Sequence, residues 1–197
     1  IWSDKQFNNN KPIVLELACG KGEYTVNLAK LFPEKNFIGI DYKGNRIWRG
    51  AKTVLEENIS NVAFLRIQIE NILDYFQPSE VSEIWITFPD PQLRISKAKK
   101  RLTHPKFLRL YQQFLQKGGA VNLKTDSPNL YHFTKGVIDV FDIHCEAATD
   151  DVYNSFYNSD ILNIKTYYET LNIAKSNSIH YLKFTIDNEL DRKSTRL

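Results

Sequence analysis

Short apolar runs alternate with helical segments along most of this chain, and this alternation constrains the fold more than any other feature. Six runs have the composition of buried strands, namely 13–17, 37–40, 62–67, 84–88, 120–124 and 181–186. Between them, apolar residues recur at helical spacing in 24–32, 45–58, a short stretch around Leu73 and Phe76, 103–115 and 131–140. Lys117-Gly118-Gly119 has the composition of a helix C-cap. The pattern predicts a doubly wound, mostly parallel α/β sheet with helices on both faces.

The length of 197 residues, with 42% hydrophobic residues, is that of one domain. We expect its core to span about 13–186, with a polar loop at 149–160 and a polar tail at 187–197. No run of 18 apolar residues is present, so we expect no membrane association. Cys19 and Cys145 are far apart and fit reduced thiols in the cytoplasm. The four histidines have no metal-ligand spacing, so no metal is expected, and the oligomeric state stays open.

The first predicted strand ends in Glu16-Leu-Ala-Cys-Gly20-Lys-Gly22, a turn in which backbone can approach a ligand closely. Thr25 stands where a dinucleotide-binding turn has its third glycine, and Glu16 would repel a pyrophosphate. Asp41 ends the next strand, at the distance where an acid binds ribose hydroxyls. The turn therefore suits a nucleoside with cationic groups, such as S-adenosylmethionine (SAM). The alternative is an ordinary strand-to-helix turn that binds no ligand, in which the glycines are needed only for the backbone conformation.

The third strand ends near Gln68, whose amide can hydrogen-bond an adenine edge, and Glu70 is a second candidate there. Beyond the fourth strand, two prolines flank Asp90 and restrict the direction of its carboxylate. A proline-rich turn with an aspartate cap is the alternative interpretation. Trp48 and Trp85 are expected to pack in the core, with stacking on a base as the alternative.

A basic run follows this turn. Positions 94–109 hold seven of the 26 Lys and Arg residues and no acid, so the other 19 are outnumbered by 23 acidic residues. Such a local concentration of positive charge is typical of surfaces that bind phosphates. A solvated helix face or a nuclear-type address explains such a run equally well.

Six segments together resemble the bacterial tRNA (guanine-N7)-methyltransferases: ELACGKG (16–22), FIGID (37–41), FPDP (88–91), KKRLTHPKFL (99–108), LKTD (123–126) and TYYE (166–169). The resemblance implies a Rossmann-like, seven-stranded sheet, SAM as methyl donor, and tRNA as substrate, with a variable-loop guanine (position 46 in the family) as the target. It implies SAM contacts at Glu16, Gly20, Gly22, Asp41, Gln68 and Asp90, with Asp90 also the catalytic acid. It implies tRNA contacts at Arg94, Asp126, Thr166, Tyr167, Tyr168 and Glu169.

Four residues depart from that family's usual pattern. Ala18 stands in place of glycine and Gln68 in place of aspartate; Gln92 replaces tryptophan, and Arg94 replaces lysine. An arginine keeps the charge and adds bidentate hydrogen bonding to phosphate. At position 68 an amide thus replaces the carboxylate that the family pattern has.

N7 of guanine carries a lone pair and no proton, so direct attack on the methyl group needs no general base. Nearby acids would then stabilise the cationic product, and we expect Asp90, Asp126 and Glu169 to do so. Two other functions stay open. One is methylation of an exocyclic amine, although Gln92 stands where such enzymes need an aromatic residue. The other is a non-catalytic RNA-binding subunit that has lost SAM.

Overall fold

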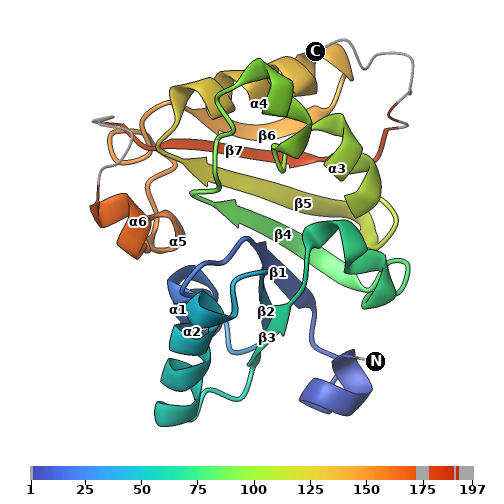
Figure 1. Ribbon diagram of the computed structural model, residues 1–197, viewed down its shortest axis with the longest axis vertical. Helices are drawn as coiled ribbons and strands as arrows, with labels where there is room; N and C mark the ends of the chain where they lie inside the picture. Colours follow the sequence, from blue (N-terminus) through green and yellow to red (C-terminus); the bar gives the residue numbers. More distant parts are fainter. Residues whose placement is uncertain (1, 172–177, 189, 191–197) are drawn as a thin grey trace.

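A computed structural model describes residues 2–171, 178–188 and 190 and contains one sheet of seven strands (Figure 1). The strands are β1 (Ile13–Leu17), β2 (Asn36–Asp41), β3 (Val62–Arg66), β4 (Val81–Thr87), β5 (Leu115–Thr125), β6 (His144–Thr149) and β7 (His180–Thr185). Their order is β3-β2-β1-β4-β5-β7-β6, and all neighbours are parallel except β7, which is antiparallel to both β5 and β6. The predicted doubly wound, mostly parallel sheet is confirmed.

The helices follow the crossovers of this sheet. They are α1 (Glu23–Leu31), α2 (Gly44–Glu56), α3 (Pro105–Tyr111), α4 (Pro128–Val140) and the one-turn α5 (Asp160–Asn163) and α6 (Tyr167–Thr170). Shorter helical segments are η1 (Trp2–Phe7), η2 (Ile69–Asp74) and η3 (Ile95–Lys100). Helices α3 and α4 each begin with a proline after a capping side chain, since His104 Nδ1 accepts from Lys106 N–H and Ser127 Oγ accepts from Leu130 N–H.

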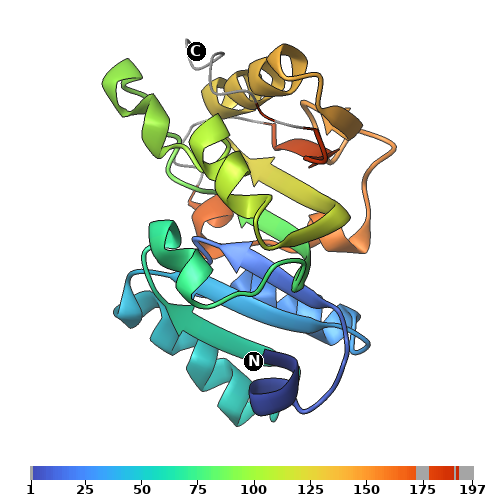
Figure 2. The same cartoon turned by 90° about the vertical axis from the view of Figure 1, so that its right-hand side faces the viewer.

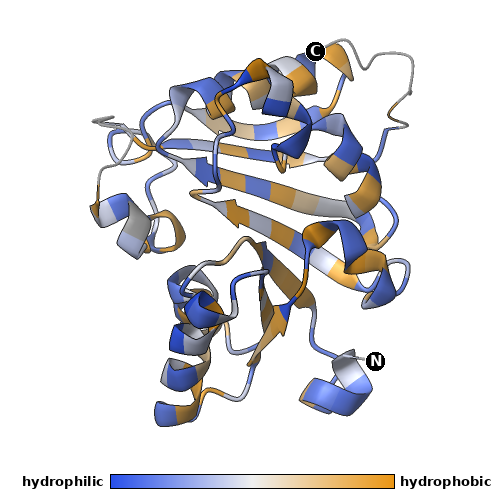
Figure 3. Ribbon diagram, viewed as in Figure 1, coloured by the Kyte–Doolittle hydropathy of each residue, from blue (hydrophilic) through white to orange (hydrophobic). Residues whose placement is uncertain are grey.

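Two apolar cores lie on opposite faces of the sheet. Alternate residues of β1 divide between them, because side chains along a strand point to opposite faces. Ile13, Leu15 and Leu17 join η2, α3 and α4, whereas Val14 joins α1 and the segment that contains α5. Apolar residues dominate β1 to β3 in Figure 3. In Figure 2 the half with β1 to β3 lies below the half with β5 to β7, and β1 and β4 join the two.

Several expectations about individual elements were wrong. Strand β6 was missed, and Gly118 and Gly119 do not cap a helix: α3 ends at Tyr111, and the two glycines form an irregularity inside β5. In α2, only Ile47 and Gly50 are buried, while Trp48 is 61% exposed. Trp48 therefore does not pack in the core, and its exposed ring has the surroundings that the alternative, stacking on a base, requires.

The expected loop and tail also contain packed residues. Val152, within 149–160, is fully buried and its N–H donates to Ile179 O at 2.7 Å. Leu190, within the predicted tail, is 3% exposed and packs on the core. The remainder of 187–197 beyond Asn188 lies outside the described residues. None of the helices that the structure describes is long and apolar enough to cross a bilayer.

Candidate functional site

The turn after β1 has a left-handed backbone at three of its positions. Ala18 and Gly20 have φ of 57° and Gly22 has φ of 74°. A Cβ on Gly22 would stand 2.6 Å from the Phe64 ring, so this position requires glycine. Ala18 adopts the same backbone region although it has a Cβ. The left-handed conformation is strained for such a residue, so the replacement of the family's glycine by Ala18 is unfavourable for the backbone. Gly20 and Gly22 are buried, while Ala18 and Lys21 are partly exposed, so the turn reaches the surface at those two positions.

Asp41 fixes this turn from the end of β2. Its Oδ2 accepts from Gly20 N–H at 3.0 Å, and its Oδ1 accepts from Lys43 N–H at 2.9 Å. The side chain is buried. The structure thus brings Gly20 and Asp41 into direct contact, as their positions at neighbouring strand ends suggested.

Glu16 lies beneath the turn on the face of α1 and is 3% exposed. Its carboxylate accepts from Thr25 N–H at 2.8 Å, from the Thr25 hydroxyl and, through the other oxygen, from the Thr87 hydroxyl. Glu16 therefore ties the start of α1 to the end of β4. Burial raises the pKa of Glu16 from its ordinary value of 4.5 to about 7, although the hydrogen bonds from Thr25 and Thr87 oppose the rise.

Glu16→Gln is expected to change how stability depends on pH. Because the pKa is raised on folding, the stability that Glu16 contributes is present below pH 4.5 and is lost as the pH rises through about 7. The glutamine side chain of the variant has no ionised form to bury, so the stability of the variant relative to the wild type should rise by about 2–3 kcal/mol between pH 5 and pH 8. Urea unfolding at the two pH values measures this. The exposed Glu34→Gln variant is the control, and equal gains in both variants would contradict the assignment.

The turn after β4 holds Asp90 between two residues with strained backbone. Phe88 and Gln92 both have φ of 46°, a region that costs a non-glycine residue of order 1 kcal/mol and often marks functional sites. Asp90 is exposed, and its Oδ1 accepts from Gln92 N–H at 3.0 Å. Arg101 braces the turn by donating to the carbonyls of Pro91 and Gln92.

Arg101 belongs to the basic run, but its guanidinium is used inside the protein, where it binds the Asp90 turn. Its guanidinium lies 4.4 Å from the Phe133 ring centroid, and partial burial lowers its pKa. Arg94 and the lysines at 97, 99 and 100 are exposed. The positive surface that adjoins Asp90 is therefore made by the residues that precede Arg101.

Lys124 forms the buried centre of the site, and sequence reasoning did not single it out. Its side chain is fully buried, and Nζ donates to Ile164 O at 2.8 Å and pairs with Glu169 Oε2 at 3.1 Å. The Tyr153 hydroxyl donates to the other oxygen of Glu169. Burial lowers the pKa of Lys124, while Glu169 opposes that shift. A lysine in an otherwise apolar strand, in VNLKT, is the sequence signal that points to this pair.

Three contacts attach the segment 160–170 to the rest of the site, two of them from the glycine turn and α1 and one from β5. The Tyr24 hydroxyl donates to Ile161 O at 2.6 Å, and Lys21 Nζ lies 3.2 Å from the Tyr167 ring centroid. Lys124 and Glu169 make the third contact, with Nζ of Lys124 also 5.5 Å from the Tyr24 ring centroid. Tyr167 is thus brought beside the turn, and Thr166 and Glu169 lie in the same short segment. The side chain of Tyr168 lies outside the described residues.

The other predicted site residues follow other strands at the same edge of the sheet. Gln68 and Arg94 are exposed, after β3 and after the Asp90 turn. Asp126 is half-buried between β5 and α4. No group of three or more His, Cys, Asp or Glu side chains suited to a metal occurs among the described residues.

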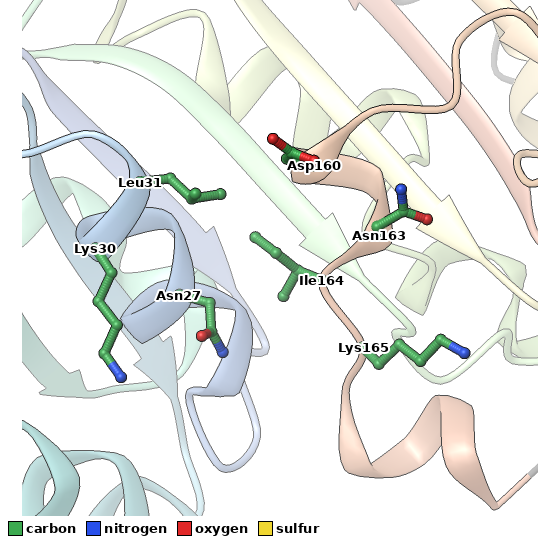
Figure 4. A pocket seen from close by; sticks show the side chains of 7 residues that line it. All are labelled: Asn27, Lys30, Leu31, Asp160, Asn163, Ile164 and Lys165. Carbon is green, nitrogen blue, oxygen red and sulfur yellow. The ribbon is translucent and has the colours of Figure 1, made fainter.

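A pocket of about 390 Å³ lies between the last turns of α1 and the segment around α5 (Figure 4). Leu31 and Ile164 face each other across it, and the side chains of Lys30 and Lys165 point apart. Its described lining includes none of the residues predicted to bind SAM or tRNA. It is lined by α1 and by residues 160–165, and not by the glycine turn.

The fold and the turn after β1 define the class of this protein. A SAM-dependent methyltransferase from Aquifex aeolicus superposes with a TM-score of 0.61 at 13% identity, covering 89% of this chain and 84% of the other. The chain therefore has the Rossmann-like fold of SAM-dependent methyltransferases.

Sequence comparisons give the family. A family model described as "Putative methyltransferase" matches residues 10–182. The tRNA (guanine-N(7)-)-methyltransferase of Porphyromonas gingivalis is 52% identical, covering 93% of this chain and 75% of that relative. The protein of the same name from Christiangramia forsetii is 49% identical, covering 94% and 83%. The chain belongs to the tRNA (guanine-N(7)-)-methyltransferase family.

Proposed function

We propose that this protein transfers a methyl group from SAM to N7 of a guanine in tRNA, the activity that its relatives' names state. One observation of the structure carries the proposal: an exposed carboxylate, Asp90, is held rigidly beside the glycine turn and directly before a basic surface. The two turns are neighbours because β1 and β4 pair in parallel, with Leu17 opposite Ile86. Ligands of open α/β sheets bind at such adjoining strand ends.

The chemistry of the residues at the glycine turn fits SAM. The turn is surrounded by acids, Glu16 and Asp41, and its own cation, Lys21, lies over the Tyr167 ring. SAM carries a positive sulfonium and a positive ammonium group, which acids favour. Gly22 has no room for a Cβ because the Phe64 ring packs against it, so the glycine lets the turn fold closely onto β3. We assign SAM binding to Glu16, Gly20, Gly22, Asp41, Gln68 and Asp90.

When bound, SAM supplies an electrophilic methyl group. Guanine N7 has no proton to lose, so the chain has to align and stabilise the reacting groups and does not need to remove a proton. Asp90 is suited to this task because the strained backbone at Phe88 and Gln92 holds its carboxylate in one direction. Its negative charge favours the cationic N7-methylguanine that forms.

We assign tRNA contacts to Arg94, Asp126 and the segment 166–169, with a variable-loop guanine as the target. In that segment the Tyr167 side chain is 44% exposed, with Lys21 Nζ 3.2 Å from its ring centroid. The carboxylate of Glu169 is already paired with Lys124 and Tyr153. We therefore infer that Glu169 acts mainly by holding the segment in place, while Asp126 is the acid available to read the base.

The test uses unmodified tRNA and labelled SAM. We expect label in tRNA and chain cleavage at one guanine under conditions that break the strand at N7-methylguanine. The matched control is the same tRNA with 7-deazaguanine at that position, which lacks N7 and should receive no label. Labelling of the 7-deaza tRNA would instead indicate methylation of an exocyclic amine. Binding of tRNA without binding of SAM in calorimetry would indicate a non-catalytic subunit. We expect the protein to act in the cytoplasm, where its substrate is found.

A further inference from the structure

Helix α2 presents an exposed aromatic and basic surface, here called the α2 surface. Its two aromatic residues, Tyr42 and Trp48, are 59% and 61% exposed. Four cations and no acid occur between Tyr42 and Leu55. The α2 surface consists of Tyr42, Lys43, Arg46, Trp48, Arg49 and Lys52.

The aromatic and basic side chains of this surface are interleaved. Lys43 Nζ lies 5.3 Å from the Tyr42 ring centroid, and Lys52 Nζ lies 5.6 Å from that of Trp48. Arg66, at the end of β3, donates to Tyr42 O at 3.2 Å and adds a further positive charge beside the surface. A largely exposed tryptophan is uncommon; Trp85, in β4, is only 4% exposed.

The α2 surface and the basic residues 94–100 lie on either side of the predicted reaction centre. Helix α2 begins just after the carboxyl end of β2, and η3 follows the Asp90 turn after β4. Strand β1, with the glycine turn, lies between β2 and β4. A nucleic acid whose base enters the site between them would therefore extend over both basic surfaces.

We propose that the α2 surface is a second tRNA-binding surface, in which Trp48 stacks on an unpaired base and Arg49 and Lys52 contact phosphates. The choice of tRNA as the RNA that binds here rests on the proposed function. RNA is favoured over a protein partner because four cations, one of which, Lys52, lies 3.5 Å from Glu56 at the end of α2, complement a polyanion, and exposed aromatic rings among cations suit bases and phosphates together. An enzyme that acts on a base also needs the flanking strands held while that base is extracted from its stack.

The experiment measures tRNA affinity as a function of salt for three variants. Trp48→Ala is expected to raise the Kd for tRNA about tenfold, from the loss of one stacked base, while Trp48→Phe should stay close to the wild type. Arg49→Ala/Lys52→Ala should reduce the slope of log affinity against log salt by about two, from the loss of two phosphate contacts. The Kd for SAM and kcat at saturating tRNA should not change.

The control removes two exposed lysines elsewhere, in Lys5→Ala/Lys117→Ala; Lys5 lies in η1 and Lys117 near the amino end of β5. This variant should keep the wild-type slope. Wild-type affinity and slope in the α2 variants would overturn the second surface while leaving methylation of tRNA intact. A changed oligomeric state of Trp48→Ala with unchanged tRNA affinity would also overturn it, because a second copy of the chain would then cover this face. Wild-type protein that binds tRNA through α2 without methylating it would support the surface and refute the proposed function.

Discussion

Asp90→Ala is expected to lower kcat for methyl transfer to tRNA by about 10²–10³-fold, while the Kd for SAM rises much less. Removing one preorganised group that stabilises developing charge has effects of this size. Because Asp90 is exposed, its removal should leave the fold intact. Single-turnover transfer of labelled methyl groups, together with calorimetry of SAM binding, separates the two quantities.

Asp90→Asn separates the charge from the shape of the turn. An asparagine keeps the Oδ1 atom that accepts from Gln92 N–H, so the turn should persist without its charge. We expect Asp90→Asn to lose nearly as much activity as Asp90→Ala. The exposed Asp74→Asn variant in η2 controls for a general change of surface charge. A fully active Asp90→Ala enzyme would refute the catalytic role.

Lys124→Met is expected to lower the free energy of unfolding by about 3–5 kcal/mol. The substitution leaves the carboxylate of Glu169 buried without its cation, and removal of one partner from a buried ion pair has a cost of this order. The double variant Lys124→Met/Glu169→Gln should recover most of the loss, because no charge is then buried. Urea unfolding at neutral pH measures all three proteins.

The neighbouring pair of Lys183 and Glu146 provides the control for this series. These side chains are 2.5 Å apart but about one-third exposed, so Lys183→Met should cost no more than about 1 kcal/mol. Equal losses in the free energy of unfolding from Lys124→Met and Lys183→Met would show that burial does not increase the contribution of the Lys124–Glu169 pair to stability. An additive loss in the double variant would show that Lys124 and Glu169 stabilise the fold independently.

The strands that lie inside the sheet were predictable because their residues are apolar on both faces. Ile13 to Leu17 are all buried, and a short, almost entirely apolar run of this kind is typical of a strand that is covered on both faces. Strand β6 has one buried residue, Ala147, and an exposed edge, so its sequence carries no strand pattern. Trp48 was misplaced for a related reason: a helical pattern shows which residues share a face, but not how much of that face the sheet covers.

The sequence also indicated which residues gather at the site, but not how they are paired. Gly20 and Asp41 follow neighbouring strands, and parallel strands bring their ends together. The partners of Glu16 are different, because Thr87 is 71 residues away and only the register of β4 beside β1 brings it near. The pairing of Lys124 with Glu169 likewise depends on how the segment 160–170 folds over α1, which no local pattern encodes.

The position of β7 has a consequence for synthesis of this protein on the ribosome. Strand β7 comes last among the described strands yet lies between β5 and β6, and within the described residues it is the only strand through which β6 joins the sheet. Until residue 185 has been made and released, a nascent chain leaves one side of β5 unpaired and β6 without its strand partner. Unpaired strand edges attract other chains, so β5 and β6 are open to mispairing until β7 is added, whereas β1, β2 and β4, which carry the glycine turn and Asp90, can pair before it is made.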